Sequence, residues 1–220
     1  MKQVAAKKKH VINPGPPRRL PGFESIKHSW DAVHHMYAAR ILPGEYYVSC
    51  DRELIVTTLG SCVSACIRDR KTGIGGMNHF MLPDDNGSIE RDGACLSTAT
   101  RYGSFAMEHM INDILANGGR KNNLEIKLFG GGNIMRSMTD IGTRNISFVR
   151  QYLGNENLQI QSEDLGGSHP RKVLYFPFSG RVLVRKMPLA RRSSDEIVRQ
   201  ETQYRDSLSE SPLTGDIDLF

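Results

Sequence analysis

The apolar residues of the chain recur with two different spacings, which predict strands in some segments and helices in others. Apolar residues three and four positions apart predict helices over 97–116 and 140–153. Short apolar runs bounded by turn residues predict strands over 46–49, 54–56, 63–67, 74–82, 124–129, 158–162, 172–176 and 180–185. The order is strands, helix, strand, helix, strands, with no repeated βαβ unit. It predicts an α/β domain of the layered α+β type.

This predicted domain covers residues 44–187 and leaves an extension at each end. Residues 1–20 hold six lysines and arginines and no acid, whereas the whole chain has a formal charge of +5. The positive charge is therefore a property of the basic, proline-containing extension 1–43, in which apolar residues at helical intervals over 23–42 predict a short amphipathic helix. Residues 188–220 are polar and predict a tail that is partly helical or disordered.

Composition narrows the class of protein further. The hydrophobic fraction is 39%, the mean hydropathy is −0.41, and no run of apolar residues approaches the ~20 that a membrane span needs. Lys7, Lys8 and Lys9 come before any apolar segment, so the N-terminus does not read as a secretory signal and a cytoplasmic location is expected. Four irregularly spaced cysteines indicate free thiols. The body lacks the basic, aromatic-interleaved pattern of a nucleic-acid-binding surface.

The most distinctive chemistry lies between 54 and 83. Cys62 follows Gly60 and Ser61 at a break between two predicted strands, where the backbone can bend and little side-chain bulk surrounds the sulfur. The next apolar run carries His79, and the turn 71–73 between the two strands can bring the imidazole beside the thiol. A histidine in that position can hold a thiolate and later protonate a leaving amine. Cys62 is therefore expected to be the most reactive thiol.

A third group is expected to orient the imidazole. Thr57 and Thr58 offer hydroxyls at the end of the preceding strand. Successive strand residues face opposite sides, so one of the two threonines should point into the site and the other away from it.

Several ordered motifs resemble the CheD family, the chemoreceptor glutamine deamidases of bacterial chemotaxis. They are TTLGSCVSACIRDRKTGIGGMNHFMLP (57–83), LFGGGN (128–133), IGTRN (141–145) and DLGG (164–167). The resemblance implies a β-sandwich core flanked by helices, like that of toxin-type glutamine deamidases. It also implies that Cys62 is the nucleophile and His79 the general acid/base. The family's third residue, a threonine shortly before the cysteine, maps onto Thr57 or Thr58, and Thr57 is preferred because it lies five residues before Cys62.

The glycine run 130–132 follows a predicted strand, but it lacks the spacing of a dinucleotide fingerprint and the Lys-Ser/Thr ending of a P-loop. It predicts a tight turn or a close backbone approach beside the active-site strands.

Three functions fit these residues. The resemblance favours a protein-glutamine deamidase that converts glutamines of methyl-accepting chemotaxis receptors to glutamate through a thioester on Cys62. Backbone N–H groups near Ser61 and Cys62 would form the oxyanion hole, and no metal or cofactor is expected. The second is an adaptor that binds a receptor or a CheC-type phosphatase, with catalysis secondary. The third, a zinc site on Cys62, Cys66 and His79, is disfavoured because strand residues four apart lie about 13 Å from each other.

Overall fold

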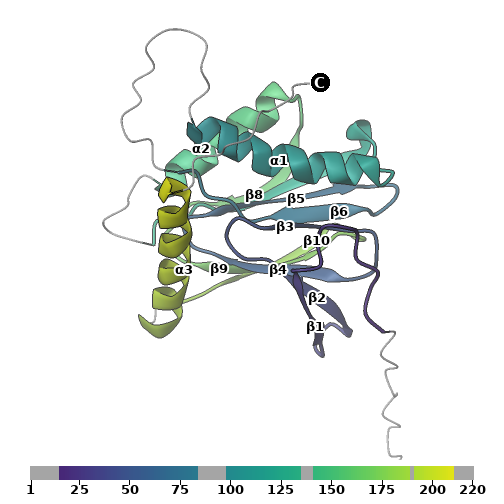
Figure 1. Ribbon diagram of the computed structural model, residues 1–220, viewed down its shortest axis with the longest axis horizontal. Coiled ribbons are helices and arrows are strands. Elements are labelled where there is room, and N and C mark those ends of the chain that lie inside the picture. The colour runs from purple at the N-terminus through teal and green to yellow at the C-terminus, as the bar shows by residue number, and fades with distance from the viewer. Residues whose placement is uncertain (1–14, 84–97, 135–140, 189–190, 211–220) are drawn as a thin grey trace, which may run out of the picture.

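The computed structural model describes residues 15–83, 98–134, 141–188 and 191–210. Two five-stranded sheets stack on each other, and two helices form a third layer on one of them (Figure 1). Residues 1–14 of the predicted N-terminal extension 1–43, including Lys7, Lys8 and Lys9, lie outside the described residues.

The first sheet has the strand order β1-β2-β4-β9-β10. Its β2–β4 pair is parallel and its other neighbours are antiparallel. Its strands are β1 (Lys27–Asp31), β2 (Met36–Arg40), β4 (Leu54–Leu59), β9 (Arg171–Phe176) and β10 (Arg181–Lys186).

The second sheet has the order β3-β6-β5-β7-β8. The β7–β8 pair is parallel and the other pairs are antiparallel. Its strands are β3 (Tyr46–Ser49), β5 (Val63–Asp69), β6 (Gly75–Asn78), β7 (Leu124–Gly130) and β8 (Ile160–Leu165), and a short 3₁₀ turn, η1 (Lys121–Asn123), leads into β7.

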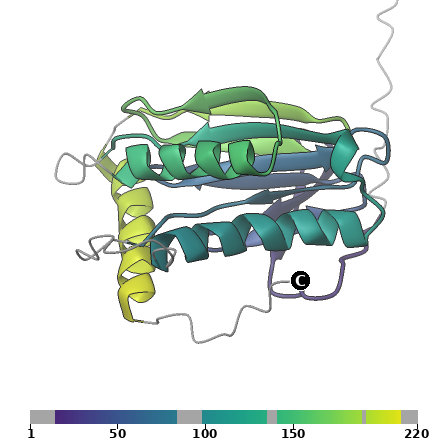
Figure 2. The same ribbon diagram turned by 90° about the horizontal axis from the view of Figure 1, so that it is seen from above.

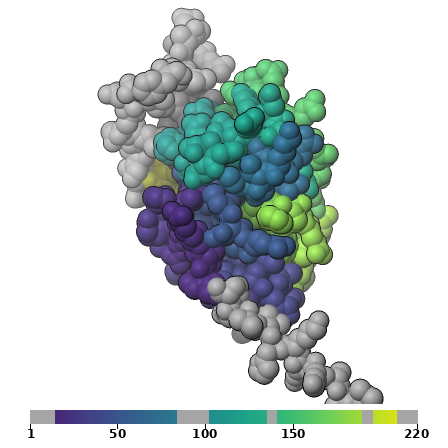
Figure 3. Space-filling model, turned by 90° about the vertical axis from the view of Figure 1, so that its right-hand side faces the viewer, coloured from purple at the N-terminus to yellow at the C-terminus, as the bar shows by residue number. Residues whose placement is uncertain are grey.

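The helices cover two different parts of this sandwich. Helices α1 (Thr98–Ala116) and α2 (Ile141–Asn155) lie on the outer face of the second sheet, so both faces of its central strand β5 are buried. Helix α3 (Arg191–Glu210) runs across one end of both sheets, roughly perpendicular to α1 (Figures 1 and 2). The end of the molecule seen in Figure 3 instead shows the N-terminal segment, the β5–β6 hairpin, α1 and the β9–β10 hairpin.

The predicted layered α+β class is confirmed, and the strands and helices of the body lie within a few residues of their predicted bounds. The long apolar runs of β4 and β5 are explained by burial on both sides of each strand. Among the described residues, no helix is long and apolar enough to cross a membrane.

The prediction of a helix over 23–42 is wrong, because this segment forms the antiparallel hairpin β1–β2. The Asp31 carboxylate accepts hydrogen bonds from the backbone N–H groups of Val33 and His34, which fixes a tight turn. Trp30 and Tyr37 lie opposite each other in the hairpin, with ring centroids 5.4 Å apart. The same apolar residues that fit a helical spacing therefore fit two short strands, and β2 extends the first sheet by pairing with β4.

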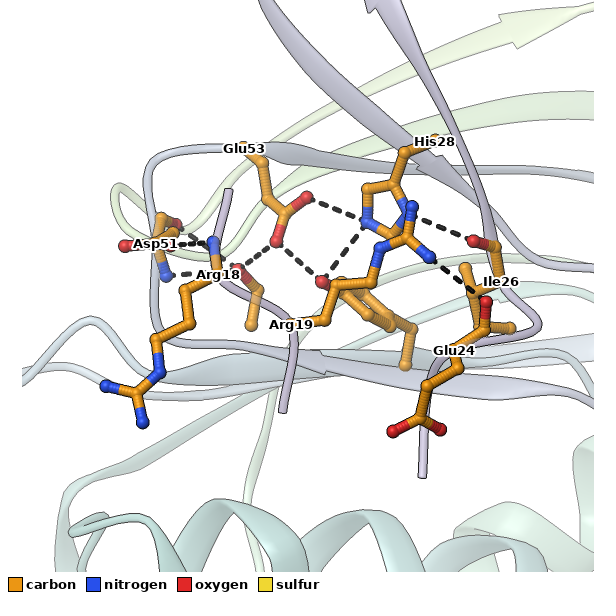
Figure 4. Close-up of polar contacts among 9 residues, drawn as sticks. Arg18, Arg19, Glu24, Ile26, His28, Asp51 and Glu53 are labelled. Atoms are coloured by element: carbon orange, nitrogen blue, oxygen red, sulfur yellow. Dashed lines mark hydrogen bonds and ion pairs between the residues drawn. The ribbon is translucent and has the colours of Figure 1, made fainter. Parts of the chain in front are cut away.

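The segment before β1 is tied to the sandwich by polar contacts (Figure 4). The backbone N–H of Arg18 donates to Asp51, and the Arg19 guanidinium donates to the carbonyl of Glu24. The side chains of His28 and Glu53 are buried next to this segment, with a ring nitrogen and a carboxylate oxygen 3.1 Å apart. Part of the predicted N-terminal extension thus belongs to the folded body.

Candidate active site

Strands β5 and β6 bring Cys62 and His79 together. Cys62 precedes β5 and His79 follows β6, and the antiparallel pairing continues beyond both strands through reciprocal backbone hydrogen bonds between Val63 and Phe80 of 3.0 Å each. The Cys62 Sγ atom and a ring nitrogen of His79 lie within 4.8 Å of each other. Both side chains are buried, with 0% and 2% exposure.

Thr57 contacts the His79 ring and determines its tautomer. The Thr57 Oγ1 lies 2.8 Å from His79 Nδ1 and 2.9 Å from the carbonyl oxygen of Ile41. A carbonyl can only accept, so the threonine hydroxyl donates to Ile41 and its oxygen accepts from Nδ1–H. Nε2 is then the unprotonated nitrogen, and it has no hydrogen-bond partner among the described residues. The imidazole is arranged as a base.

Thr58 occupies a different environment. Alternation along β4 places Thr57 on the side of Ile55 and Leu59, which belong to the main core, and Thr58 on the opposite side. Thr57 is 1% exposed, whereas Thr58 is only partly buried. Of the two threonines, it is Thr57 that the fold puts against the imidazole.

The backbone of His79 is also fixed. Its N–H donates to the carbonyl of Glu45, and its carbonyl accepts from the N–H of Gly44. These two residues lie in the turn between β2 and β3, so the turn fixes the backbone of His79 while Thr57 contacts one nitrogen of its ring.

The loop 60–62 rests on the glycine run that follows β7. The N–H of Gly131 donates to the carbonyl of Cys62, and the N–H of Gly132 donates to the carbonyl of Gly60, each at 2.7 Å. Gly130 has a φ of 108°, and a Cβ at this position would collide with the Cys62 carbonyl. The prediction of a close backbone approach beside the active-site strands is confirmed.

Asn145 of α2 links the two halves of the site. Its Nδ2 donates to the carbonyl of Ser61 at 2.9 Å, and its Oδ1 accepts from the N–H of Leu82 at 2.9 Å. The side chain is completely buried. It was not identified as a site residue from the sequence, although it closes the IGTRN motif. One amide thereby joins the segment that carries Cys62 to the segment that carries His79.

Glu201 of α3 enters the site from the far end of the chain. Its Oε1 accepts from the N–H of Gly60 at 2.8 Å and of Cys62 at 3.3 Å. Its Oε2 accepts from the N–H of Ser61 at 2.8 Å and from the Ser61 hydroxyl at 2.6 Å. Glu201 is 1% exposed. The region predicted to be a polar tail therefore supplies a buried carboxylate beside Cys62.

The electrostatics of this arrangement favour uncharged groups. Burial raises the pKa of the Cys62 thiol well above its usual range, and the neighbouring Glu201 charge raises it further. Burial lowers the pKa of His79 to about 3. A neutral thiol thus faces a neutral imidazole in this arrangement. That Cys62 is the most reactive thiol stays a prediction. Cys50 is exposed, whereas Cys62 and Cys66 are buried.

The same groups bear on the disfavoured zinc hypothesis. Ligand atoms of Cys62, His79 and Glu201 all lie within 4.8 Å of one another, and Cys66 is not part of this group. Each carboxylate oxygen of Glu201 already accepts two hydrogen bonds, which occupies its lone pairs. A metal ion bound by Glu201 would have to replace some of these bonds. The carboxylate is arranged as an acceptor for the loop 60–62.

Comparisons with known proteins agree on one family. A family model described as CheD chemotactic sensory transduction matches residues 81–186. The chain is 54% identical over 205 residues to the probable chemoreceptor glutamine deamidase CheD of Halorhodospira halophila, covering 93% of this chain and 94% of that protein. It is 48% identical over 205 residues to the protein of the same name from Hahella chejuensis, covering 93% and 95%. A match of this length in a chain of 220 residues leaves 15 uncovered, so it includes positions 62, 79 and 201.

Proposed function

The chain belongs to the CheD family, and from this membership together with the site geometry we propose that it is a chemoreceptor glutamine deamidase. It hydrolyses the side-chain carboxamide of receptor glutamines to a carboxylate and releases ammonia. Cys62 is the nucleophile, His79 the general acid/base and Thr57 the residue that positions His79. The observation that carries this assignment is the Thr57–His79 hydrogen bond, which leaves an unprotonated Nε2 available to the thiol.

In the first half of the reaction, His79 Nε2 takes the thiol proton as Cys62 Sγ forms a bond with the carboxamide carbon. The electron pair of the C=O bond moves to oxygen, and the resulting oxyanion needs hydrogen-bond donors. The N–H groups of Ser61 and Cys62 supply them, joined by that of Gly60, since all three converge on one carboxylate in the structure. The C–N bond then breaks as His79 gives its proton to the leaving ammonia.

The second half of the reaction hydrolyses the thioester. A water molecule attacks the same carbon while His79 Nε2 takes a proton from it, and the same donors stabilise the second oxyanion. Collapse of this intermediate expels the Cys62 sulfur, which recovers the proton from His79. The products are a glutamate side chain and the free enzyme, and no oxidation or reduction takes place.

The proposed substrates are the cytoplasmic parts of methyl-accepting chemotaxis receptors, because the curated relatives are named as chemoreceptor glutamine deamidases. The protein then works in the cytoplasm. A CheC-type phosphatase is the second proposed partner, by the resemblance set out from the sequence.

The test is mass spectrometry of a receptor cytoplasmic fragment incubated with the protein. Wild-type protein should convert specific glutamines to glutamate, and Cys62→Ala should not, because the nucleophile is missing. Equal conversion by both proteins would remove Cys62 from the mechanism.

The adaptor hypothesis is tested in the same experiment by measuring receptor binding. Cys62→Ala should still bind the fragment, since the change removes one buried sulfur. A wild-type protein that binds the receptor without converting any glutamine would favour an adaptor.

A further inference from the structure

Helix α3 packs against the active-site end of the sandwich with a face that carries both apolar and polar side chains. Ile197, Glu201 and Tyr204 follow the spacing of one helix face, and Ile197 and Glu201 are buried there while Tyr204 is partly buried. The neighbouring positions Glu196, Arg199 and Gln200 are exposed. A helix that only covered an apolar edge would not be expected to place a carboxylate at the centre of its buried face.

The Glu201 carboxylate occupies the position that the reaction assigns to a substrate oxygen. Backbone N–H groups at the nucleophile stabilise an oxyanion in acyl transfer, and here those of Gly60, Ser61 and Cys62 all donate to Glu201. A glutamate side chain has the length of a glutamine side chain, and its carboxylate is the chemical product of glutamine hydrolysis. Glu201 therefore resembles the product that the enzyme would release.

The rest of α3 fits tightly against the site. The Tyr204 ring lies so close to Gly44 that a Cβ there would collide with it, and Gly44 is hydrogen-bonded to the His79 carbonyl. The ring centroids of Tyr204 and Tyr102 of α1 are 6.5 Å apart. With α3 in place, Cys62 is completely buried, so a glutamine side chain from another protein cannot reach it.

We propose that α3 is an intramolecular occupant of the glutamine-binding site, with Glu201 in the place of the product glutamate, and that the enzyme works only after α3 has moved away. The proposal rests on the function proposed above, because it takes the loop 60–62 as the oxyanion hole.

The charge of Glu201 adds a chemical effect to the steric one. A carboxylate beside Cys62 disfavours the thiolate, and burial disfavours both the thiolate and the imidazolium. Removal of α3 would take away the negative charge and admit water. A receptor glutamine then competes with Glu201 for the same donors, so a high local concentration of receptor favours the open enzyme.

The test compares Glu201→Ala with Glu196→Ala in the full-length chain. Glu196 lies on the same helix but is exposed and contacts Arg199 and Gln200, so its replacement is a matched control. We expect Glu201→Ala to raise both the alkylation rate of Cys62 and the deamidation rate of a receptor fragment by about 10-fold or more, since each lost hydrogen bond to a charged group shifts an equilibrium by at least that order. Glu196→Ala should match wild type in both assays.

Iodoacetamide labelling read at the Cys62 peptide separates this cysteine from the exposed Cys50. A Glu201→Ala protein that folds but deamidates more slowly than wild type, or in which Cys62 stays protected, would overturn the proposal and make Glu201 a support of the loop. If wild type and Glu201→Ala both fail to deamidate while Cys62 becomes reactive in the variant, the proposal that α3 occupies the site is supported and the proposed deamidase activity is contradicted.

Glu201→Gln supplies a second test that preserves the size of the side chain. If the carboxamide stays docked, Cys62 should convert Gln at position 201 back to Glu, and the double variant with Cys62→Ala should keep it as Gln. If it undocks, Cys62 should become as reactive as in Glu201→Ala. An amide that stays docked and unconverted, in a chain that still deamidates the receptor, would show that Glu201 does not lie in the substrate position.

Discussion

His28 and His79 are both buried histidines with a carboxylate nearby, and they differ in how their ring nitrogens are used. The Nδ1 of His28 lies 3.0 Å from the carbonyl oxygen of Ile26, and its Nε2 lies 3.2 Å from the Tyr47 hydroxyl oxygen and 3.1 Å from Glu53 (Figure 4). Both ring nitrogens of His28 therefore have polar partners within the fold. His79 has a partner at Nδ1 and, among the described residues, none at Nε2.

The carboxylates differ in the same way. Glu53 accepts hydrogen bonds from the hydroxyls of Tyr47 and Ser49, so it completes a network of side chains within the core. Glu201 accepts mainly from backbone N–H groups of the loop that carries Cys62. A buried histidine whose partners are all present supports the fold, whereas one with an unused nitrogen beside a thiol is available for chemistry.

The largest expected effect separates the two histidines directly. His79→Gln should lower the rate of glutamine deamidation by about 10²–10⁴-fold, the scale of losing a general acid/base. His28→Gln should instead lower the free energy of unfolding by about 1–3 kcal/mol, because it removes the ring that contacts the buried Glu53 carboxylate. Ammonia release and urea denaturation measure the two effects, with the rate of His28→Gln compared per folded molecule.

The parent chain for these rates is wild type or Glu201→Ala, whichever is the more active. The comparison of the two histidines would break down if His28→Gln lost its activity while remaining folded.

A smaller effect is expected from the residue that orients His79. Thr57→Val keeps the β-branched shape but removes the acceptor of the Nδ1–H, so deamidation should slow by roughly 10- to 100-fold, equivalent to about 1.4–2.8 kcal/mol in the transition state. Thr58→Val is the matched control on the other side of β4 and should stay within a few-fold of the parent, as measured by ammonia release. Equal rates for both variants would leave Cys62 and His79 as a dyad.

An effect of similar size concerns acid stability. His79 titrates at about 3 in the folded chain, and an unfolded histidine titrates near 6.5, so the unfolded state binds more protons between these values. Stability is thus unaffected by this group above about pH 6.5 and is lost as the pH falls below it. Among the described residues, Cys62 and Glu201 each bring a titratable atom within 4.8 Å of a ring nitrogen of His79.

Urea denaturation at two pH values measures this loss. Between about pH 7.5 and pH 5, wild type should lose roughly 2 kcal/mol more than His79→Gln, and the difference between the two proteins cancels the titration of other groups. An identical pH dependence in both would show that His79 is not held neutral by burial.

Local patterns in the sequence were sufficient for most of the fold. Alternating and periodic apolar residues predicted the strands β3 to β10 and the helices α1 and α2, because each of these elements buries a face that its own apolar residues mark. The pair of Cys62 and His79 was also predictable, since a short turn joins the strands that carry them and antiparallel pairing then sets their distance. The segment 23–42 was misread because Trp30, Met36 and Tyr37 fit both a helical spacing and a hairpin, and pairing with β4 favoured the hairpin.

Three features of the site came from contacts between distant segments. Thr57 and Thr58 are equivalent in sequence, and the stacking of the two sheets decided that Thr57 faces His79. Asn145 and Glu201 lie 84 and 140 residues from Ser61 in the chain. The residues that flank them in the sequence do not indicate a contact with so distant a segment. The sequence alone determined which groups could do the chemistry. The packing of α3 across the sandwich decided that a carboxylate accepts hydrogen bonds from the loop 60–62 beside the buried Cys62 thiol, because the charge at a site depends on every segment that reaches it.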